Sequence, residues 1–312
     1  ADLTIYTYES FNSEWGPGPV VFKSFEEQCG CKIKIVTPGD SGTVLNRVIL
    51  EQANPKADIL LGLNNSELEK SFSYKLWIPY RSPLLEQVLT DLRVDKKHRV
   101  TPFDYGFISF VYDSQKLKNP PRKLEDLLDP EYRRKIVIEN PKTSSPGLSM
   151  LHWTIAVFGE DGYLDYWKKL QKNLLSVTDG WSAAYGMFTK GEVPIVLSYV
   201  TSPAYHLEYE KTERYQAALF EEGHYRQIEF AGIIKGTKKI KRAQEFIDFM
   251  LSENFQNAIP LTNWMYPVIK HQPLPDSFRI APEPKAVPEL SASLVYKQNT
   301  KWLKAWSRAM SE

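Results

Sequence analysis

The chain has 312 residues, of which 42% are hydrophobic and 25% charged, a balance typical of a globular protein with one large domain or two of ordinary size. Its 39 basic and 38 acidic residues nearly cancel, so there is no electrostatic case for nucleic acid or an anionic membrane as the main partner. No apolar run approaches the ~18 residues needed to cross a bilayer.

The first hundred residues alternate between predicted strands and predicted helices. Strands are expected at 3–8, 32–36 and 57–61, with helices at 20–28 and from Thr43 onward. This alternation implies a parallel sheet with right-handed crossovers. Ligands of such sheets bind outside the carboxyl ends of the strands, which here are the polar segments 8–15, 37–42 and 63–66.

A second α/β alternation follows. Its predicted elements are a strand at 105–112, a strand at 135–139, helices at 148–158 and 162–172, a strand at 193–197 and a returning strand at 227–234. We therefore expect an α/β protein with two lobes, residues 1–103 plus 231–312 and residues 104–230. Two crossings would join the lobes around a ligand cleft that closes by a hinge motion.

The C-terminal part adds two predicted helices, at 241–251 and 294–310. In the last of them Trp302, Leu303, Trp306 and Met310 follow helical spacing. We interpret this stripe as a docking face rather than a ligand site.

The segment 191–206, GEVPIVLSYVTSPAYH, changes abruptly from an apolar run to hydroxyls and aromatics. A buried strand that ends in this way is typical of a ligand crevice. The alternative is a loop whose tyrosines only cover the core.

Aromatic residues gather at the predicted strand ends, and Asn263 adjoins one of them. The set consists of Tyr8, Trp15, Trp181, Tyr199, Tyr205 and Trp264. Ring faces attract cations by ~0.5–2 kcal/mol each, so these residues would suit a flat cationic ligand.

Two polar pairs, Asp40 with Ser41 and Ser144 with Ser145, stand just before predicted helices. Hydroxyls and N–H groups at a helix N-terminus bind anions or polar oxygens. The alternative for each pair is ordinary N-capping, for which Asp and Ser are preferred.

Catalytic motifs are missing from the sequence: there is no Gly-x-Ser-x-Gly, Walker loop or Gly-x-Gly-x-x-Gly. A ferric site made by Tyr199, Tyr205 and His206 remains an alternative, although no carboxylate lies in the same stretch, and we expect no metal site. Cys29 and Cys31 have no second ligand pair for zinc. They form either a disulfide in an oxidising compartment or two reduced thiols.

Taken together, several segments resemble the periplasmic thiamine-binding proteins of bacterial ABC importers. The resemblance covers residues 3 to about 267 and rests on YTYESFNSEWGPGPVV, KADILLGLNN, PFDYGF, TSSPGLSML, GWSAAYGMF, LSYVTSPAYH, EGHY and FQNAIPLTNWMYP, in this order. The longer of these segments are specific enough to make a chance match improbable.

The resemblance implies a type II periplasmic-binding fold and a non-enzymatic carrier of thiamine, thiamine monophosphate or thiamine diphosphate. It implies no cofactor, a membrane permease and an ATPase as partners, a monomer, and a periplasmic location after loss of a signal peptide. It also favours the disulfide between Cys29 and Cys31.

The resemblance also assigns roles to individual residues. The six aromatics would line the pocket, with Tyr205 stacked on the thiazolium ring. Asp40, Ser41 and Ser144 would bind the hydroxyethyl or phosphate end. The tetrad DSGT at 40–43 departs from the family pattern, which leaves the phosphate preference and the role of Ser41 open.

Two other functions stay open at this point. A thiaminase would share the fold and the ligand but needs a free cysteine. A ferric or polyamine carrier of the same fold would need tyrosinates or cleft carboxylates, and the sequence points to no such carboxylates.

Overall fold

The computed structural model describes residues 1–312 and divides into two compact units. Unit 1 contains residues 1–105 and 228–275, and unit 2 contains residues 106–227 and 276–312. The chain passes from one unit to the other three times, twice within the long strands β5 (Val100–Asp113) and β10 (Arg226–Ile234). None of the helices is both long and apolar enough to span a membrane.

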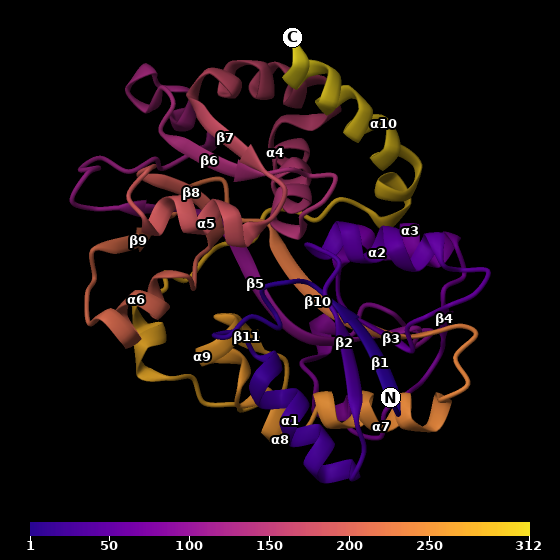
Figure 1. Cartoon of the computed structure of the whole chain (residues 1–312). Coiled ribbons are helices and arrows are strands. Elements are labelled where there is room, and N and C mark those ends of the chain that lie inside the picture. The colour runs from indigo at the N-terminus through magenta and orange to yellow at the C-terminus, as the bar shows by residue number, and fades with distance from the viewer. The chain divides into compact units, whose positions relative to one another are not determined.

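Unit 1 is a mixed α/β unit. Its elements are β1 (Leu3–Thr7), α1 (Gly18–Cys29), β2 (Ile33–Val36), α2 (Ser41–Leu50), β3 (Ile59–Asn64), α3 (Leu68–Ser73), β4 (Trp77–Ile78), α7 (Ile240–Met250), α8 (Glu253–Gln256), α9 (Ile259–Asn263) and β11 (Tyr266–Pro267). Strand β1 pairs in parallel with β2 and β3, whereas β10 pairs antiparallel with β3 and β4. Figure 1 shows α2 and α3 on one side of β1, β2 and β3, and α1, α7 and α8 on the other. The predicted parallel alternation is therefore present in the first hundred residues.

Phenylalanines form the contact between α1 and the helices α7 and α8. The Phe25 ring lies 5.1 Å from Phe246 and 5.4 Å from Phe249, both on α7. All three side chains are buried. The helix predicted at 241–251 is thus present as α7, and its buried Phe246 and Phe249 pack on a core of rings.

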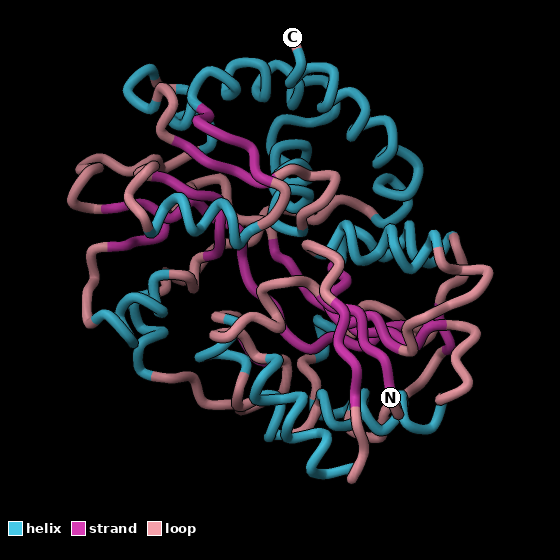
Figure 2. Tube along the Cα trace, in the orientation of Figure 1, coloured by secondary structure: helices cyan, strands magenta, loops and turns pink.

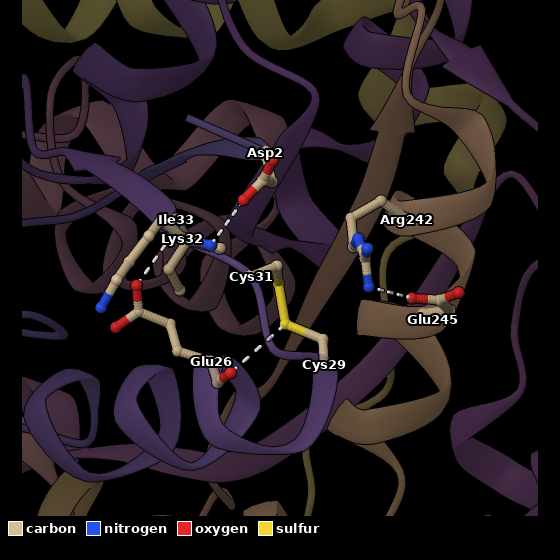
Figure 3. Close-up of a disulfide and its surroundings, with 8 residues drawn as sticks. All are labelled: Asp2, Glu26, Cys29, Cys31, Lys32, Ile33, Arg242 and Glu245. Atoms are coloured by element: carbon tan, nitrogen blue, oxygen red, sulfur yellow. Dashed lines mark hydrogen bonds and ion pairs between the residues drawn. A yellow bond between two sulfur atoms is a disulfide. The ribbon is translucent and has the colours of Figure 1, made fainter.

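The two cysteines form a disulfide at the end of α1, as Figure 3 shows. Gly30 between them adopts the left-handed conformation, with φ of 60°, and ends the helix. Glu26 of the last turn accepts the backbone N–H of Ile33 at 3.0 Å, which ties α1 to β2. The alternative of two reduced thiols is not the state in this structure.

Unit 2 is a second α/β unit. Its elements are β6 (Ile136–Glu139), α4 (Ser145–Leu170), β7 (Leu174–Thr178), α5 (Trp181–Thr189), β8 (Ile195–Tyr199), α6 (Pro203–Glu210), β9 (Tyr215–Ala217) and α10 (Ala292–Ser311). Strand β6 pairs in parallel with β7 and β8, and β5 runs antiparallel to β8 and β9. Figure 2 shows the strands of this unit with helices on both sides.

Period-two alternation separates two cores in unit 2. Ile136 and Ile138 of β6 face a core with α4 and α10, whereas Val137 between them faces a core with α5. The strand at 174–178 was not predicted from the sequence. The two predicted helices at 148–158 and 162–172 are the two parts of α4, which is interrupted at Gly159 with φ of 75°.

The C-terminal segment differs from the expectation, because residues 276–312 belong to unit 2 and not to the unit of residues 231–275. Trp302 and Trp306 of α10 are buried in the same core as Trp153 and Trp167 of α4. The docking face predicted for these tryptophans is present, but helical spacing alone could not identify the surface on which it docks.

Candidate functional site

Tyr8 directly follows β1 and lies over β3. Gly62 of β3 has φ of +123°, and a Cβ added there would lie 2.4 Å from Cδ1 of the Tyr8 ring. Only glycine therefore allows the ring to approach the strand so closely. The Tyr8 ring also packs edge-to-face on Phe11, with centroids 5.7 Å apart.

The Tyr8 hydroxyl belongs to a buried polar cluster in unit 1, formed with Asn263, Asp104 and Glu229. The hydroxyl donates to Glu229 Oε2 at 3.2 Å and accepts from Asn263 Nδ2 at 3.0 Å. The same Asn263 nitrogen lies 2.6 Å from Asp104 Oδ2 and 3.3 Å from Glu229 Oε2. Two of the predicted site residues, Tyr8 and Asn263, are thus brought together by two carboxyl groups.

Burial dominates the electrostatics of these two carboxyls. Asp104 is fully buried and Glu229 is 5% exposed. Desolvation raises the pKa of Asp104 from 3.8 to about 6. The pKa of Glu229 is raised well above 4.5, first by desolvation and then by the charge of Asp104. No basic side chain is among the groups that shift either pKa.

Sequence reasoning missed Asp104 and Glu229. The signal was present, because each carboxylate interrupts an otherwise apolar strand, in PFDYGF and QIEFAG. A charged side chain inside a buried strand needs a partner, and buried carboxyls with shifted pKa values cluster at functional sites.

Two tryptophans complete the predicted set in unit 1. Trp264 ends α9 in the left-handed conformation, with φ of 56°, and is half-buried. Such a backbone is uncommon for a large side chain. Trp15, by contrast, is 76% exposed.

Asp40 and Ser41 stand at the N-terminus of α2. Asp40 Oδ1 accepts the backbone N–H of Ser41 at 2.9 Å, so Asp40 serves as the N-cap of the helix. Ser41 is buried. Asp40 therefore caps the helix, as the alternative interpretation held. A contact between Asp40 and a ligand is a separate hypothesis.

In unit 2, Tyr199 is the last residue of β8. Its hydroxyl accepts Gln227 Nε2 at 2.8 Å, and Gln227 Oε1 in turn accepts the Ser149 hydroxyl at 2.9 Å. Gln227 and Ser149 are fully buried. The Tyr199 hydroxyl is therefore held by a neutral amide whose own orientation is set by a hydroxyl on α4.

Trp181, at the start of α5, is held by two serines that follow the apolar run of β8. Its indole Nε1 donates to Ser198 Oγ at 2.9 Å, and Ser198 Oγ is 2.7 Å from Ser202 Oγ. Ser202 Oγ also accepts the backbone N–H of Tyr199 at 3.3 Å. The serines at 198 and 202 thus link Trp181 with Tyr199.

Tyr205 on α6 is half-buried, and its ring packs edge-to-face on His206 with centroids 5.1 Å apart. His206 is 1% exposed and is bonded on both ring nitrogens, by Glu210 and by the Tyr185 hydroxyl. Desolvation lowers the pKa of His206. The His206 imidazole therefore holds neighbouring side chains in place. Both of its nitrogens are engaged, so neither is available as the imidazole ligand of the ferric alternative.

Ser144 and Ser145 stand at the N-terminus of α4, and both are buried. Ser144 is the N-cap residue, but its side chain makes no capping hydrogen bond. Its Oγ is buried without a hydrogen-bond partner in the protein. Ser144 therefore differs from Asp40, because capping does not account for its hydroxyl.

The predicted site residues fall into two groups. Tyr8, Trp15, Asp40, Ser41, Asn263 and Trp264 lie in unit 1, and Ser144, Ser145, Trp181, Tyr199 and Tyr205 lie in unit 2. In each unit the polar atoms of an aromatic residue are held by buried partners. The two supports differ in charge, since unit 1 uses carboxyls and unit 2 uses hydroxyls and an amide.

Comparison with known proteins identifies the family of the chain. Residues 54–300 match the family described as bacterial extracellular solute-binding protein. The thiamine-binding periplasmic protein of Escherichia coli (strain K12) is 44% identical over 309 residues, which cover 99% of this chain and 93% of that protein. The thiamine-binding periplasmic protein of Brucella abortus is 44% identical over 313 residues, which cover 99% of this chain and 92% of that protein.

A solved structure gives the same result for the fold. The structure of a periplasmic thiamin binding protein superposes with a TM-score of 0.93 at 43% identity, covering 99% of this chain and 96% of that one. The predicted type II periplasmic-binding fold is thereby confirmed. The chain belongs to the bacterial extracellular solute-binding proteins and, among them, to the family of thiamine-binding periplasmic proteins.

Proposed function

We propose that this protein is the solute-binding component of an ABC importer, which captures thiamine or its phosphates in the periplasm and delivers them to a permease and its ATPase. The observation that carries the proposal is the 44% identity to thiamine-binding periplasmic proteins along 99% of the chain. The protein would act as a carrier, would need no cofactor and would work as a monomer.

The aromatic residues are the proposed ligand contacts. In unit 1 they are Tyr8, Trp15 and Trp264, and in unit 2 they are Trp181, Tyr199 and Tyr205. Ring faces attract a cationic heterocycle such as thiazolium. The hydroxyls of Tyr8 and Tyr199 and the indole N–H of Trp181 are already held by buried partners, so these three rings would be oriented before the ligand arrives.

The polar ends of two helices are the proposed contacts for the hydroxyethyl or phosphate end. Ser144 offers a buried hydroxyl without a protein partner at the N-terminus of α4, beside Ser145. At α2 the proposed contacts are the Asp40 carboxyl, which also caps the helix, and the buried Ser41. Helix N-termini favour anions, which supports a role for Ser144 in phosphate binding.

The alternatives receive less support. Both cysteines of the chain are in the disulfide, so a thiaminase would have no cysteine nucleophile. For a ferric carrier, the Tyr199 hydroxyl is bonded to Gln227, and His206 to Tyr185 and Glu210. A polyamine carrier would need carboxyls, and the structure contains the buried Asp104 and Glu229, which sequence reasoning did not locate. The similar proteins, however, are named as thiamine-binding proteins.

The experiment is a titration followed by tryptophan fluorescence and by calorimetry. Thiamine, thiamine monophosphate, thiamine diphosphate and spermidine would be added in turn to the purified protein. We expect quenching and heat with the thiamine compounds and none with spermidine. Absence of quenching and of heat with every thiamine compound at millimolar concentration would end the proposal.

A further inference from the structure

The carboxyl groups of Asp104 and Glu229 form a buried acidic pair that no positive charge compensates. Asp104 lies on β5 and Glu229 on β10, and each influences the pKa of the other through a side-chain hydrogen bond. The other groups whose polarity or charge reaches the pair are the Tyr8 hydroxyl, the Asn263 amide and the more distant Asp40 carboxylate. Neither amide nor phenol can neutralise two negative charges.

Hydrogen-bond accounting points to one proton on this pair. Asn263 supplies two N–H donors and Tyr8 one O–H; the Asn263 amide is shared between the two carboxyls, whereas the Tyr8 hydroxyl donates to Glu229 alone. Asp104 Oδ1 is buried and receives no hydrogen bond from either. A proton held by Glu229 and donated to Asp104 would satisfy the pair and remove one charge. Two adjacent buried carboxyls behave in this way because the second ionisation is opposed by the first.

The pair also fixes two residues of the proposed ligand site. Glu229 holds Tyr8, and Asp104 holds Asn263. Asn263 immediately precedes Trp264 in the chain. A permanent cation brought close to these side chains would favour the doubly ionised pair over the singly protonated one. The proton would then leave to the solvent as the cation enters, so charge is balanced.

We propose that Asp104 and Glu229 are positioning residues that share one proton in the free protein, orient Tyr8 and Asn263, and release that proton when a cationic ring binds. This inference rests on the proposed function, because it takes thiamine as the ligand. It assigns the recognition of the ring's positive charge to a buried acidic pair in addition to the aromatic faces.

The test measures protons released on binding. Calorimetric titrations at one pH in two buffers of different ionisation enthalpy give the number of protons that leave per ligand bound. The two ligands compared are thiamine and an analogue whose five-membered ring carries carbon in place of the quaternary nitrogen. Both contain the same aminopyrimidine, so its own titration cancels from the comparison.

We expect thiamine to release up to one more proton than the neutral-ring analogue. Between about pH 6 and pH 8 the affinity for thiamine should rise by up to ~10-fold per pH unit, which is the limit for loss of one proton. Glu229→Gln and Asp104→Asn should each abolish the extra proton and flatten the pH profile. Gln227→Leu, which alters the neutral support of Tyr199, should leave the extra proton in place.

Equal proton release by thiamine and the neutral analogue in the unmodified protein would overturn the inference. That result needs no variant, so it decides the matter even if the substituted proteins fail to fold. Binding of both compounds with equal proton release would leave the proposed function intact. Absence of binding by any thiamine compound would instead remove the proposed function.

Discussion

Tyr8 in unit 1 and Tyr199 in unit 2 are both tyrosines at the end of a strand, held by a side chain from β10. Glu229 accepts from the Tyr8 hydroxyl, whereas Gln227 donates to the Tyr199 hydroxyl. Glu229 and Gln227 differ by one heteroatom, yet only Glu229 can change its charge. The Tyr8 support should therefore respond to pH and to a cationic ligand, and the Tyr199 support should respond to neither.

The contrast extends to other buried titratable groups. In unit 1, burial raises the pKa of Glu67 to about 7, and it also raises the pKa of Asp104. In unit 2, burial lowers the pKa of His152 to about 4. A buried acid with a raised pKa costs stability as pH rises, and a buried imidazole with a lowered pKa costs stability as pH falls.

The largest expected effect concerns His152, which lies in unit 2 and whose ring contacts Asn299 Oδ1 at 2.7 Å. The folded protein keeps this imidazole neutral down to about pH 4, while the unfolded chain protonates near its usual value of 6.5. Stability should therefore fall as pH drops through this window, by about 3 kcal/mol in total. Urea unfolding across the window should show that His152→Gln removes this part of the loss. An unchanged pH dependence in the variant would contradict the assignment.

Glu67 gives the opposite test in unit 1. Its carboxyl is buried and accepts the side-chain amide of Asn64 at 2.6 Å and the Asn64 backbone N–H at 3.3 Å. Because its pKa is raised from 4.5 to about 7, stability should be lost as pH rises through this window, by about 3 kcal/mol. In Glu67→Gln, which keeps an acceptor, urea unfolding should show no such loss. A variant that is equally sensitive to rising pH would show that another group is responsible.

Substitution of Gln227 tests the neutral amide that holds the Tyr199 hydroxyl. Replacing it with leucine removes the Gln227 hydrogen bonds to the hydroxyls of Tyr199 and Ser149. We expect a loss of about 2 kcal/mol in the free energy of unfolding, because each unsatisfied buried group costs roughly 1–3 kcal/mol and the added apolar contacts offset part of it. The loss should be the same at about pH 6 and pH 8. A loss that grows with pH would break the contrast with Glu229.

The smallest expected effect is the loss of thiamine affinity when the Tyr205 ring is removed. Removal of its ring in Tyr205→Ala should weaken thiamine binding by roughly 1–2 kcal/mol, the contribution of one aromatic face to a cation. Tyr205→Phe keeps the ring and should bind almost normally. Tyr296→Ala is the control for loss of an exposed ring, since Tyr296 lies on α10 and is 57% exposed. Equal affinities in all three variants would displace Tyr205 from the site.

Much of the fold was predictable because strand and helix periodicities are local. The strand of 193–197 is β8, at Ile195–Tyr199, and the returning strand at 227–234 is β10. The α/β class followed from the alternation of strands and helices, and the type II periplasmic-binding fold followed from the resemblance; the solved relative confirms the fold. The strand Leu174–Thr178 was missed because only its first residue is buried, so neither an apolar run nor a clear alternation marks it.

The supports of the candidate site were not predictable in the same way. Gln227 and Tyr199 are 28 positions apart, and Tyr8 and Glu229 are 221 apart. Periodicity indicates which face of a strand is buried, but not which distant side chain meets it there. The aromatic residues could be identified by type, whereas their partners required the fold.

The disulfide between Cys29 and Cys31 has a consequence for how the protein can be produced. It closes a loop of only two residue steps, so it restricts the unfolded chain far less than a bridge across a long loop. In the chain-entropy description such a small loop contributes roughly 1–2 kcal/mol, against about 5 for a loop of a hundred residues. The attachment of α1 does not depend on it, since Phe25 packs on α7 and Glu26 holds the backbone of Ile33. Expression in a reducing cytosol should therefore yield folded, soluble material, to which the bond can be added afterwards by mild oxidation.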